Sequence, residues 1–182
     1  MRFEQTFPLR DGRTLLVRSC TGEDSALMKK MYIDTHTETD FLLSYPDEHT
    51  FTPESEARFL REKEESPREA ELMAFVDGEA AGTAGIEAVG NKEKVRHRCE
   101  FGISVLKAYW GLGIGRVMLE SCIGLAREAG YRQMELDVVA DNARAISLYK
   151  SVGFTEYGCN PLGFVSRGGA AQALVLMRLE LK

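Results

Sequence analysis

The sequence predicts an α+β sandwich, in which about four helices flank a mixed, mostly antiparallel central sheet of about seven strands. Two Asp-Gly pairs, at 11–12 and 77–78, each separate β-like runs, which is typical of antiparallel hairpins. The amphipathic segment 116–129 lies between two further strand-like runs. A strand–helix–strand connection is right-handed and makes its two strands parallel, so the predicted sheet is mixed.

The first third of the chain is predicted to form a hairpin followed by two helices. The strand-like runs cover 2–9 and 13–18. Thr21 and Asp24 have the spacing of a capping box, which predicts a helix that fades near residue 37. Pro53 directly after Thr52 is typical of a helix start, and the second helix is short and highly charged.

The middle of the chain is predicted to form three strands, then a long helix and a fourth strand. The three strands cover 72–76, 81–89 and 95–105, and the last alternates imperfectly, as a central strand buried on both faces does. Apolar residues recur at helical spacing through 116–129, and a glycine follows in the position expected after a helix end. The run 134–139 alternates and therefore predicts a strand.

The last part of the chain is predicted to form a short helix and two strands. Asp141 and Asn142 are both good N-caps for a helix over 143–152. A short strand at 154–157, a glycine-rich loop at 158–169 and a final strand at 173–181 follow. Nothing in the sequence resembles a linker, so we expect one domain over 1–182.

Composition limits the classes of function. The 182 residues are 44% hydrophobic and 28% charged with a net charge of −5, which argues against nucleic acid as a partner. No apolar run is long enough to cross a bilayer, so no membrane partner is expected. The N-terminus lacks the apolar core of a signal peptide, and a cytoplasmic location follows as an expectation. The cysteines (Cys20, Cys99, Cys122 and Cys159) are scattered and suggest neither a metal site nor disulfides.

Segment 110–116, Trp-Gly-Leu-Gly-Ile-Gly-Arg, combines a glycine turn with a helix start. Glycine adopts positive φ and lets a ligand approach the backbone closely. The first turn of a helix has unpaired N–H groups and the positive end of the helix dipole, so the segment predicts an anion site. The spacing alone is not specific. The segment lacks the lysine of a Walker A loop, which binds nucleoside triphosphates. Arg116 stands where the dinucleotide-binding motif Gly-x-Gly-x-x-Gly requires its third glycine.

Two blocks of the sequence resemble the GNAT acyltransferase superfamily. Segment 105–115 is similar to the family's Arg/Gln-x-x-Gly-x-Gly/Ala pyrophosphate loop. Segment 142–154 is similar to its Asn-x-x-Ala-x-x-x-Tyr-x-x-x-Gly-Phe segment. One position departs from the pattern, because Trp110 replaces the Arg or Gln and removes one polar contact to the pyrophosphate. Backbone N–H groups and Arg116 are expected to supply that binding instead.

The resemblance implies a GNAT-like fold, acetyl-CoA as cosubstrate and an amine as acceptor, and the scattered cysteines give no reason to expect a metal. It places the pantetheine arm in a gap between strand 100–105 and strand 134–139. A backbone N–H near Ile103 would polarise the thioester carbonyl. The cofactor-binding residues that it implies are Ile103, Val105, Leu112, Gly113, Gly115, Arg116 and Asn142. For Asn142, a purely structural role as N-cap is the alternative.

The resemblance also implies two catalytic residues. Tyr149 matches the general acid that protonates the departing thiolate, although a buried tyrosine on the inner stripe of its helix is also a core residue. Glu100 lies on the strand beside the gap and is the first candidate for the general base that deprotonates the amine. Glu87, or a water molecule held by a carboxylate, is the alternative.

Three functions stay open at this point. The first is an N-acetyltransferase for a primary amine of a small molecule or peptide, acting by direct attack in a ternary complex. The second is a protein N-terminal acetyltransferase, with 39–49 and 158–169 shaping a peptide groove. The third is a non-catalytic acetyl-CoA-binding module. The resemblance also allows a homodimer, formed through the last strand or segment 158–169.

Overall fold

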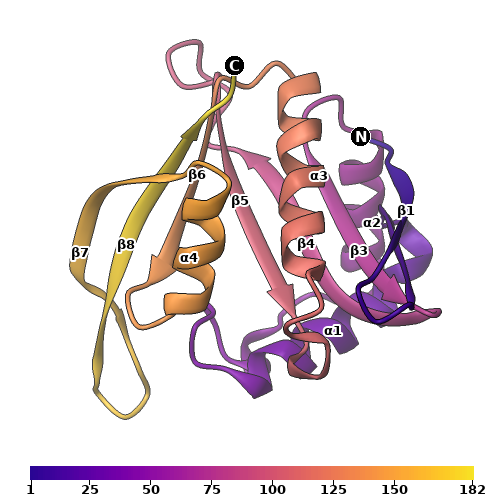
Figure 1. The fold of residues 1–182 in the computed structure, drawn as a ribbon, viewed down its shortest axis with the longest axis horizontal. Coiled ribbons are helices and arrows are strands. Elements are labelled where there is room, and N and C mark those ends of the chain that lie inside the picture. Colours follow the sequence, from indigo (N-terminus) through magenta and orange to yellow (C-terminus); the bar gives the residue numbers. More distant parts are fainter.

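The computed structural model describes residues 1–182 as one three-layer sandwich (Figure 1). A central sheet of eight strands has the order β1-β2-β3-β4-β5-β6-β8-β7. Helices α3 and α4 cover one face, and α1 and α2 cover the other (Figure 1). The α+β sandwich is therefore confirmed, with eight strands where about seven were predicted. None of the helices is both long enough and apolar enough to span a membrane.

The elements follow the predicted order closely. The strands are β1 (Glu4–Pro8), β2 (Thr14–Ser19), β3 (Ala70–Val76), β4 (Glu79–Ala88), β5 (Arg98–Val105), β6 (Gln133–Val139), β7 (Thr155–Val165) and β8 (Ala171–Glu180). The helices are α1 (Ser25–Glu38), α2 (Pro53–Glu65), α3 (Ile114–Glu128) and α4 (Ala143–Ser151). The capping box of Thr21 and Asp24 is present, and Thr52 caps α2 as predicted.

Each face of the sheet has its own apolar core. Met118 and Cys122 of α3 pack with Leu72 of β3 in the larger core. Met31 of α1 and Leu60 of α2 belong to a smaller core on the opposite face. Because side chains alternate across a strand, neighbouring residues of β5 and β6 face different helical layers.

The parallel pair β5–β6 separates along its length. The register pairs Arg98 with Gln133 and ends where Glu100 pairs with Glu135. β5 continues to Val105 beside β4, and β6 continues to Val139 beside β8. The two strands therefore part after Glu100 and leave facing edges that no strand covers.

The prediction for 158–169 is wrong. Most of this segment belongs to β7, and only the turn at 166–170 connects it to β8. The glycines satisfy packing, since a Cβ at Gly163 would lie 2.3 Å from the Cγ of Leu174, and one at Gly158 would lie 3.1 Å from Leu176. The register shifts twice along β7, which hides its alternation from the sequence.

Candidate active site

The outer half of β5 presents to the gap backbone groups that no neighbouring strand pairs with, and one of them, the Val105 carbonyl, accepts from the Trp110 indole Nε1 at 2.6 Å. The Leu106 N–H donates to the Ala81 carbonyl at 2.9 Å, so the backbone groups of that residue point toward β4. Backbone groups reverse direction at each residue of a strand. The N–H and C=O groups of Ile103 and Val105 therefore point toward β6, where the pairing has already ended. An extended chain with amide groups can pair with this edge as an added strand.

The glycine loop leads into α3 beside the same gap. Gly111 has φ +84° and Gly113 has φ +89°, and Gly113 is the N-cap of α3. The N–H groups of Leu112, Gly113 and Gly115 have no backbone acceptor, whereas the Arg116 N–H donates to the Gly113 carbonyl at 3.1 Å. The loop thus presents several free donors at the positive end of a helix dipole.

Gly115 lies where three elements meet. A Cβ at this position would stand 3.4 Å from Leu148 of α4 and 3.9 Å from Ile103 of β5. The absence of a side chain here leaves room between α3, α4 and the unpaired edge. The backbone edge, the free N–H donors and this space together fit a long, narrow ligand that ends in a phosphate group, as coenzyme A does.

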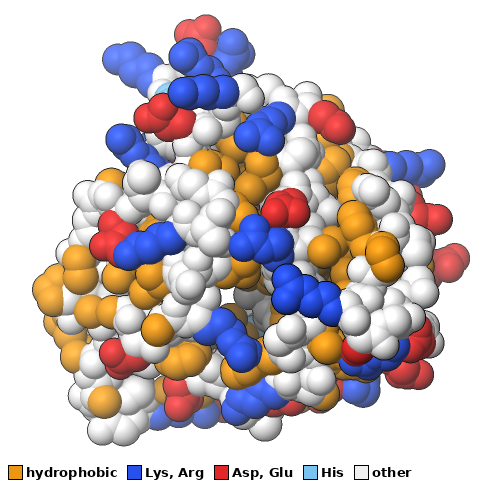
Figure 2. Space-filling view, viewed as in Figure 1, with side chains coloured by type: hydrophobic (Ala, Val, Ile, Leu, Met, Phe, Trp, Pro, Cys, Tyr) orange, Lys and Arg blue, Asp and Glu red, His pale blue; other side chains and the backbone are white.

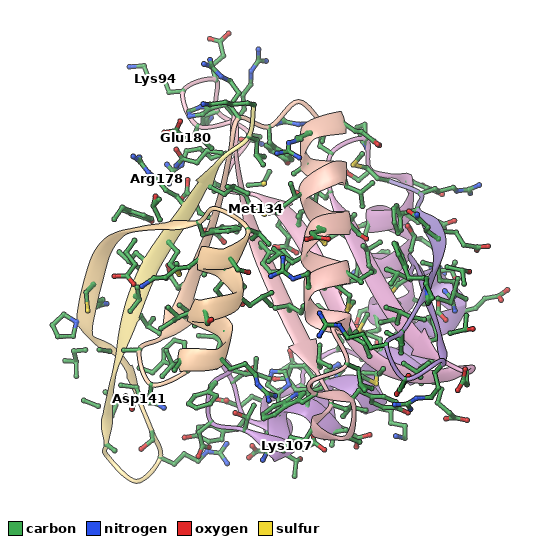
Figure 3. The ribbon with its side chains drawn as sticks, viewed as in Figure 1. Lys94, Lys107, Met134, Asp141, Arg178 and Glu180 are labelled. Carbon is green, nitrogen blue, oxygen red and sulfur yellow. The ribbon has the colours of Figure 1, made fainter.

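Basic side chains surround this part of the surface. Figure 2 shows a hollow between α4 and the first turn of α3, with Lys and Arg side chains around its rim. Lys107 and Asp141, which follow β5 and β6, lie at the same end of the sheet in Figure 3. Arg116 is exposed in the first turn of α3 and donates to Ser151 at the end of α4, at 2.6 Å. The hollow therefore has a positive rim suited to phosphate.

Tyr149 lies in the core beneath the gap. Its side chain is 7% exposed and packs against Phe101 of β5 and Phe154, with ring centroids 6.3 and 5.8 Å away. Its hydroxyl makes no hydrogen bond within the protein, and it is not among the fully enclosed polar atoms that lack a partner. Burial raises the pKa of Tyr149 to about 12, so the phenol is protonated at neutral pH and can donate a proton.

Asn142 caps α4, which confirms its structural role. Its side-chain oxygen accepts from the Ala145 N–H at 3.2 Å. The side-chain amide N–H₂ group is not used in this contact. A role in holding the cofactor stays a prediction.

Three glutamates form a row across the opposite face of the sheet. Glu87, Glu100 and Glu135 are direct neighbours on β4, β5 and β6. Lys63 of α2 binds the Glu87 carboxylate at 2.7 Å, and Arg98 pairs with Glu135. Glu100 lies between them without an ion-pair partner, at the last paired position before the strands part. Of the two glutamates predicted as base, Glu100 is thus free and Glu87 is engaged.

Asp137 is a candidate that sequence reasoning missed. It lies two residues after Glu135 on β6 and therefore on the same face, just beyond the point where β5 and β6 part. Burial, and secondly the charge of Glu135, raise the pKa of the Asp137 carboxyl. The alternation of 134–139 shows which face of the strand Asp137 lies on. Its position beside Glu100, however, depends on the register of β5 with β6, two strands that are far apart in the chain.

Two distant segments meet on this same side. The loop between α1 and α2 contacts the turn between β7 and β8, where Arg167 donates to Asp47 at 2.6 Å and its N–H donates to the Tyr45 hydroxyl at 2.8 Å. Gln172 donates to the Asp40 carbonyl at 3.2 Å. Residues of both segments line a small cavity of about 40 Å³. Segments 39–49 and 158–169 are therefore in contact, and the peptide groove that they are expected to shape stays a prediction.

The parted strands, the glycine-capped helix and the buried tyrosine are the features that the GNAT resemblance implies. The sequence model of the "Acetyltransferase (GNAT) family" matches residues 31–154, so the chain belongs to this family. The family uses acetyl-CoA.

Two named relatives resemble parts of the chain. N-alpha-acetyltransferase RimI of Mycobacterium tuberculosis is 36% identical over 93 residues, which are 51% of this chain and 56% of that protein. An L-amino acid N-acetyltransferase of Escherichia coli is 30% identical over 114 residues, which are 60% of this chain and 68% of that protein. The chain spans between 26% and 56% of the first curated relatives that it matches.

Two solved structures show the same fold. The acetyltransferase of the GNAT family from Streptococcus pneumoniae has a TM-score of 0.87 at 30% identity, covering 91% of this chain and 99% of that one. A Salmonella typhimurium structure containing its cofactor acetyl-CoA has a TM-score of 0.81 at 24% identity, covering 92% and 94%.

Proposed function

We propose that this chain transfers the acetyl group of acetyl-CoA to a primary amine by direct attack in a ternary complex. One observation carries the proposal. The glycine loop and Tyr149 lie on one face of the sheet, Glu100 and Asp137 lie on the other, and β5 and β6 part between them. A thioester that enters from the first face and an amine that enters from the second would meet in this gap.

The cofactor would be held mainly by backbone groups. The gap-facing C=O group of Ile103 and the N–H and C=O groups of Val105 pair with the pantetheine amides. The N–H groups of Leu112, Gly113 and Gly115 bind the pyrophosphate, with Arg116 adding charge and Asn142 a further contact. Bound acetyl-CoA supplies an activated acyl group. The Ile103 N–H is the donor suited to the thioester oxygen, because it is fixed by its strand before the reaction begins.

Tyr149 would donate the proton that the departing thiolate needs. The raised pKa keeps its hydroxyl protonated, and the surrounding rings fix its direction. The amine, in turn, must lose a proton before it attacks. Glu100 and Asp137 are the carboxylates at the parting of the strands. Burial and the charge of Glu135 raise the pKa of the Asp137 carboxyl, which makes it a stronger base than an ordinary aspartate.

A comparison of Asp137→Asn with Glu100→Gln tests the base. We expect Asp137→Asn to lower kcat/KM at neutral pH by about a hundredfold, and Glu100→Gln to have the smaller effect. Below the raised pKa the Asp137 carboxyl is protonated and inactive, so the wild-type rate should fall as pH falls through that range. The measurement is the pH profile of kcat/KM. If Asp137→Asn kept the wild-type pH profile of kcat/KM while Glu100→Gln lost activity, Glu100 would be the general base.

The acceptor would reach the gap beside the contact between the α1–α2 loop and the β7–β8 turn. The relatives are named for different acceptors, since one is an L-amino acid N-acetyltransferase and another is an alanine N-acetyltransferase of ribosomal protein bS18. We take a small-molecule or peptide amine as the first proposal and a protein N-terminus as the second. The contact between the two segments favours an acceptor with more than a bare amine, because it places polar side chains beyond the C-terminal end of β6.

Arg167→Ala should raise the KM for the acceptor a few-fold and leave the Kd for coenzyme A unchanged. The side chain joins the two segments through Asp47 and lies over the Tyr45 ring, but exposed pairs of this kind contribute modestly. Lys30→Ala is the matched control, because it breaks an exposed pair with Asp34 on the surface of α1. An equal effect of both variants would mean that Arg167 does not shape the acceptor site.

The proposed function is tested by thiol release from acetyl-CoA with a panel of amino acids, diamines and peptides with free N-termini. Turnover with single amines supports the first proposal, and turnover with peptides alone supports the second. Calorimetric binding of coenzyme A without turnover on any amine would identify a non-catalytic binding module.

A further inference from the structure

Trp110 lies at the outer end of the gap between β5 and β6, where its side chain contacts β5 on one side and α4 on the other. Its indole Nε1 donates to the Val105 carbonyl at 2.6 Å. The guanidinium carbon of Arg144 lies 4.9 Å from the centre of the same indole ring. Trp110 follows β5 in the chain, whereas Arg144 belongs to the first turn of α4, which follows β6. One side chain thus contacts both sides of the gap.

The carbonyl that Trp110 engages is one that a ligand in the gap needs. Val105 is the last residue of β5, and its backbone groups point away from β4. Its carbonyl is therefore the outermost acceptor on the unpaired edge of this strand. The indole N–H already fills the direction from which a pantetheine amide N–H would approach.

We propose that Trp110 is a clasp that closes the outer end of the gap and must release the Val105 carbonyl when coenzyme A binds. The inference rests on the proposed function. Trp110 stands where the GNAT loop motif that this chain resembles has Arg or Gln. An indole has one donor, so contact with Val105 and contact with a cofactor exclude each other. Arg144, freed from the ring, becomes available to the phosphates at the same rim.

The clasp can be followed directly, since Trp110 is the only tryptophan in the chain. It is 38% exposed, so its emission responds to changes in contact and in access to solvent. Titration of the wild-type protein with coenzyme A should change the emission maximum and the acrylamide quenching constant with the same midpoint as the binding heat in calorimetry. Binding heat without any change in emission or quenching would overturn the clasp.

Removing the donor tests the energetic consequence. Trp110→Phe keeps an aromatic ring beneath Arg144 but has no N–H. We expect its Kd for coenzyme A to fall roughly threefold to tenfold, the range of one net hydrogen bond, with most of the change in the association rate. Tyr157→Phe is the matched control, because it removes the polar group of another exposed aromatic side chain that lies beside an arginine, Arg178, on the edge strand β7 and away from the glycine loop. Its Kd should stay at the wild-type value.

The outcomes separate the two proposals. Absence of coenzyme A binding to the wild-type protein overturns the proposed function and the clasp together. If the wild-type protein binds coenzyme A and Trp110→Phe binds it with the same or a weaker affinity, the clasp alone is overturned. The indole would then either help to hold the cofactor or have no effect on its binding.

Discussion

Gly113→Leu is expected to lower the affinity for coenzyme A at least about a hundredfold while the protein stays folded. Gly113 is the N-cap of α3, and its φ of +89° turns the loop so that neighbouring N–H groups face outward. A leucine side chain would occupy the space in front of these donors. Loss of two charge-assisted hydrogen bonds of roughly 1.5–3 kcal/mol each predicts a change of about 3–6 kcal/mol, or roughly two to four orders of magnitude.

Gly130→Leu is the control that separates binding from backbone strain. Gly130 follows the other end of α3 and has φ +76°, and a Cβ added there would have no atom within 4 Å, as is true of Gly113. Both variants should therefore lose about 1–2 kcal/mol of stability from a left-handed residue. Calorimetry with coenzyme A and thermal unfolding measure the two effects. If Gly113→Leu bound coenzyme A as tightly as Gly130→Leu does, the glycine loop would not be the pyrophosphate site.

The elements of the fold that rest on local signals could be predicted from the sequence. Thr21, Thr52 and the residues that precede α4 mark helix starts through short-range capping, and the structure confirms each of them. β7 could not be predicted because its glycines make room for leucines of β8, a partner that follows it in the chain. A glycine that serves packing has the same local signature as one that serves a turn.

In the candidate site, too, the features with local sequence signals could be predicted and those that depend on distant contacts could not. The glycine loop and Tyr149 lie in contiguous motifs, so the sequence was sufficient to select them. Asp137 becomes a candidate only through the register of β5 with β6, which places it just beyond Glu100 where the strands part. The engagement of Glu87 by Lys63 likewise depends on α2 crossing the sheet. Contacts between elements far apart in the chain decide which carboxylates are free.

Tyr149 combines a structural role with the proposed role in proton transfer, and the two can be separated experimentally. The ring belongs to the core between α4 and β5, so its removal would disturb packing. Phenylalanine keeps the ring and removes only the hydroxyl. Because that hydroxyl has no protein partner, its loss should leave the free energy of unfolding nearly unchanged.

Tyr149→Phe should therefore lower kcat by up to about a thousandfold, with little change in the Kd for coenzyme A. The reason is that the rings around Tyr149 provide no other proton donor. Tyr131→Phe is the matched control, since Tyr131 is also buried in this core at 3% exposure and its hydroxyl has no partner. Steady-state kinetics on both variants measure the effect. Equal kcat values for the two would show that the thiolate leaves without help from Tyr149, and the raised pKa of about 12 would then reflect burial alone.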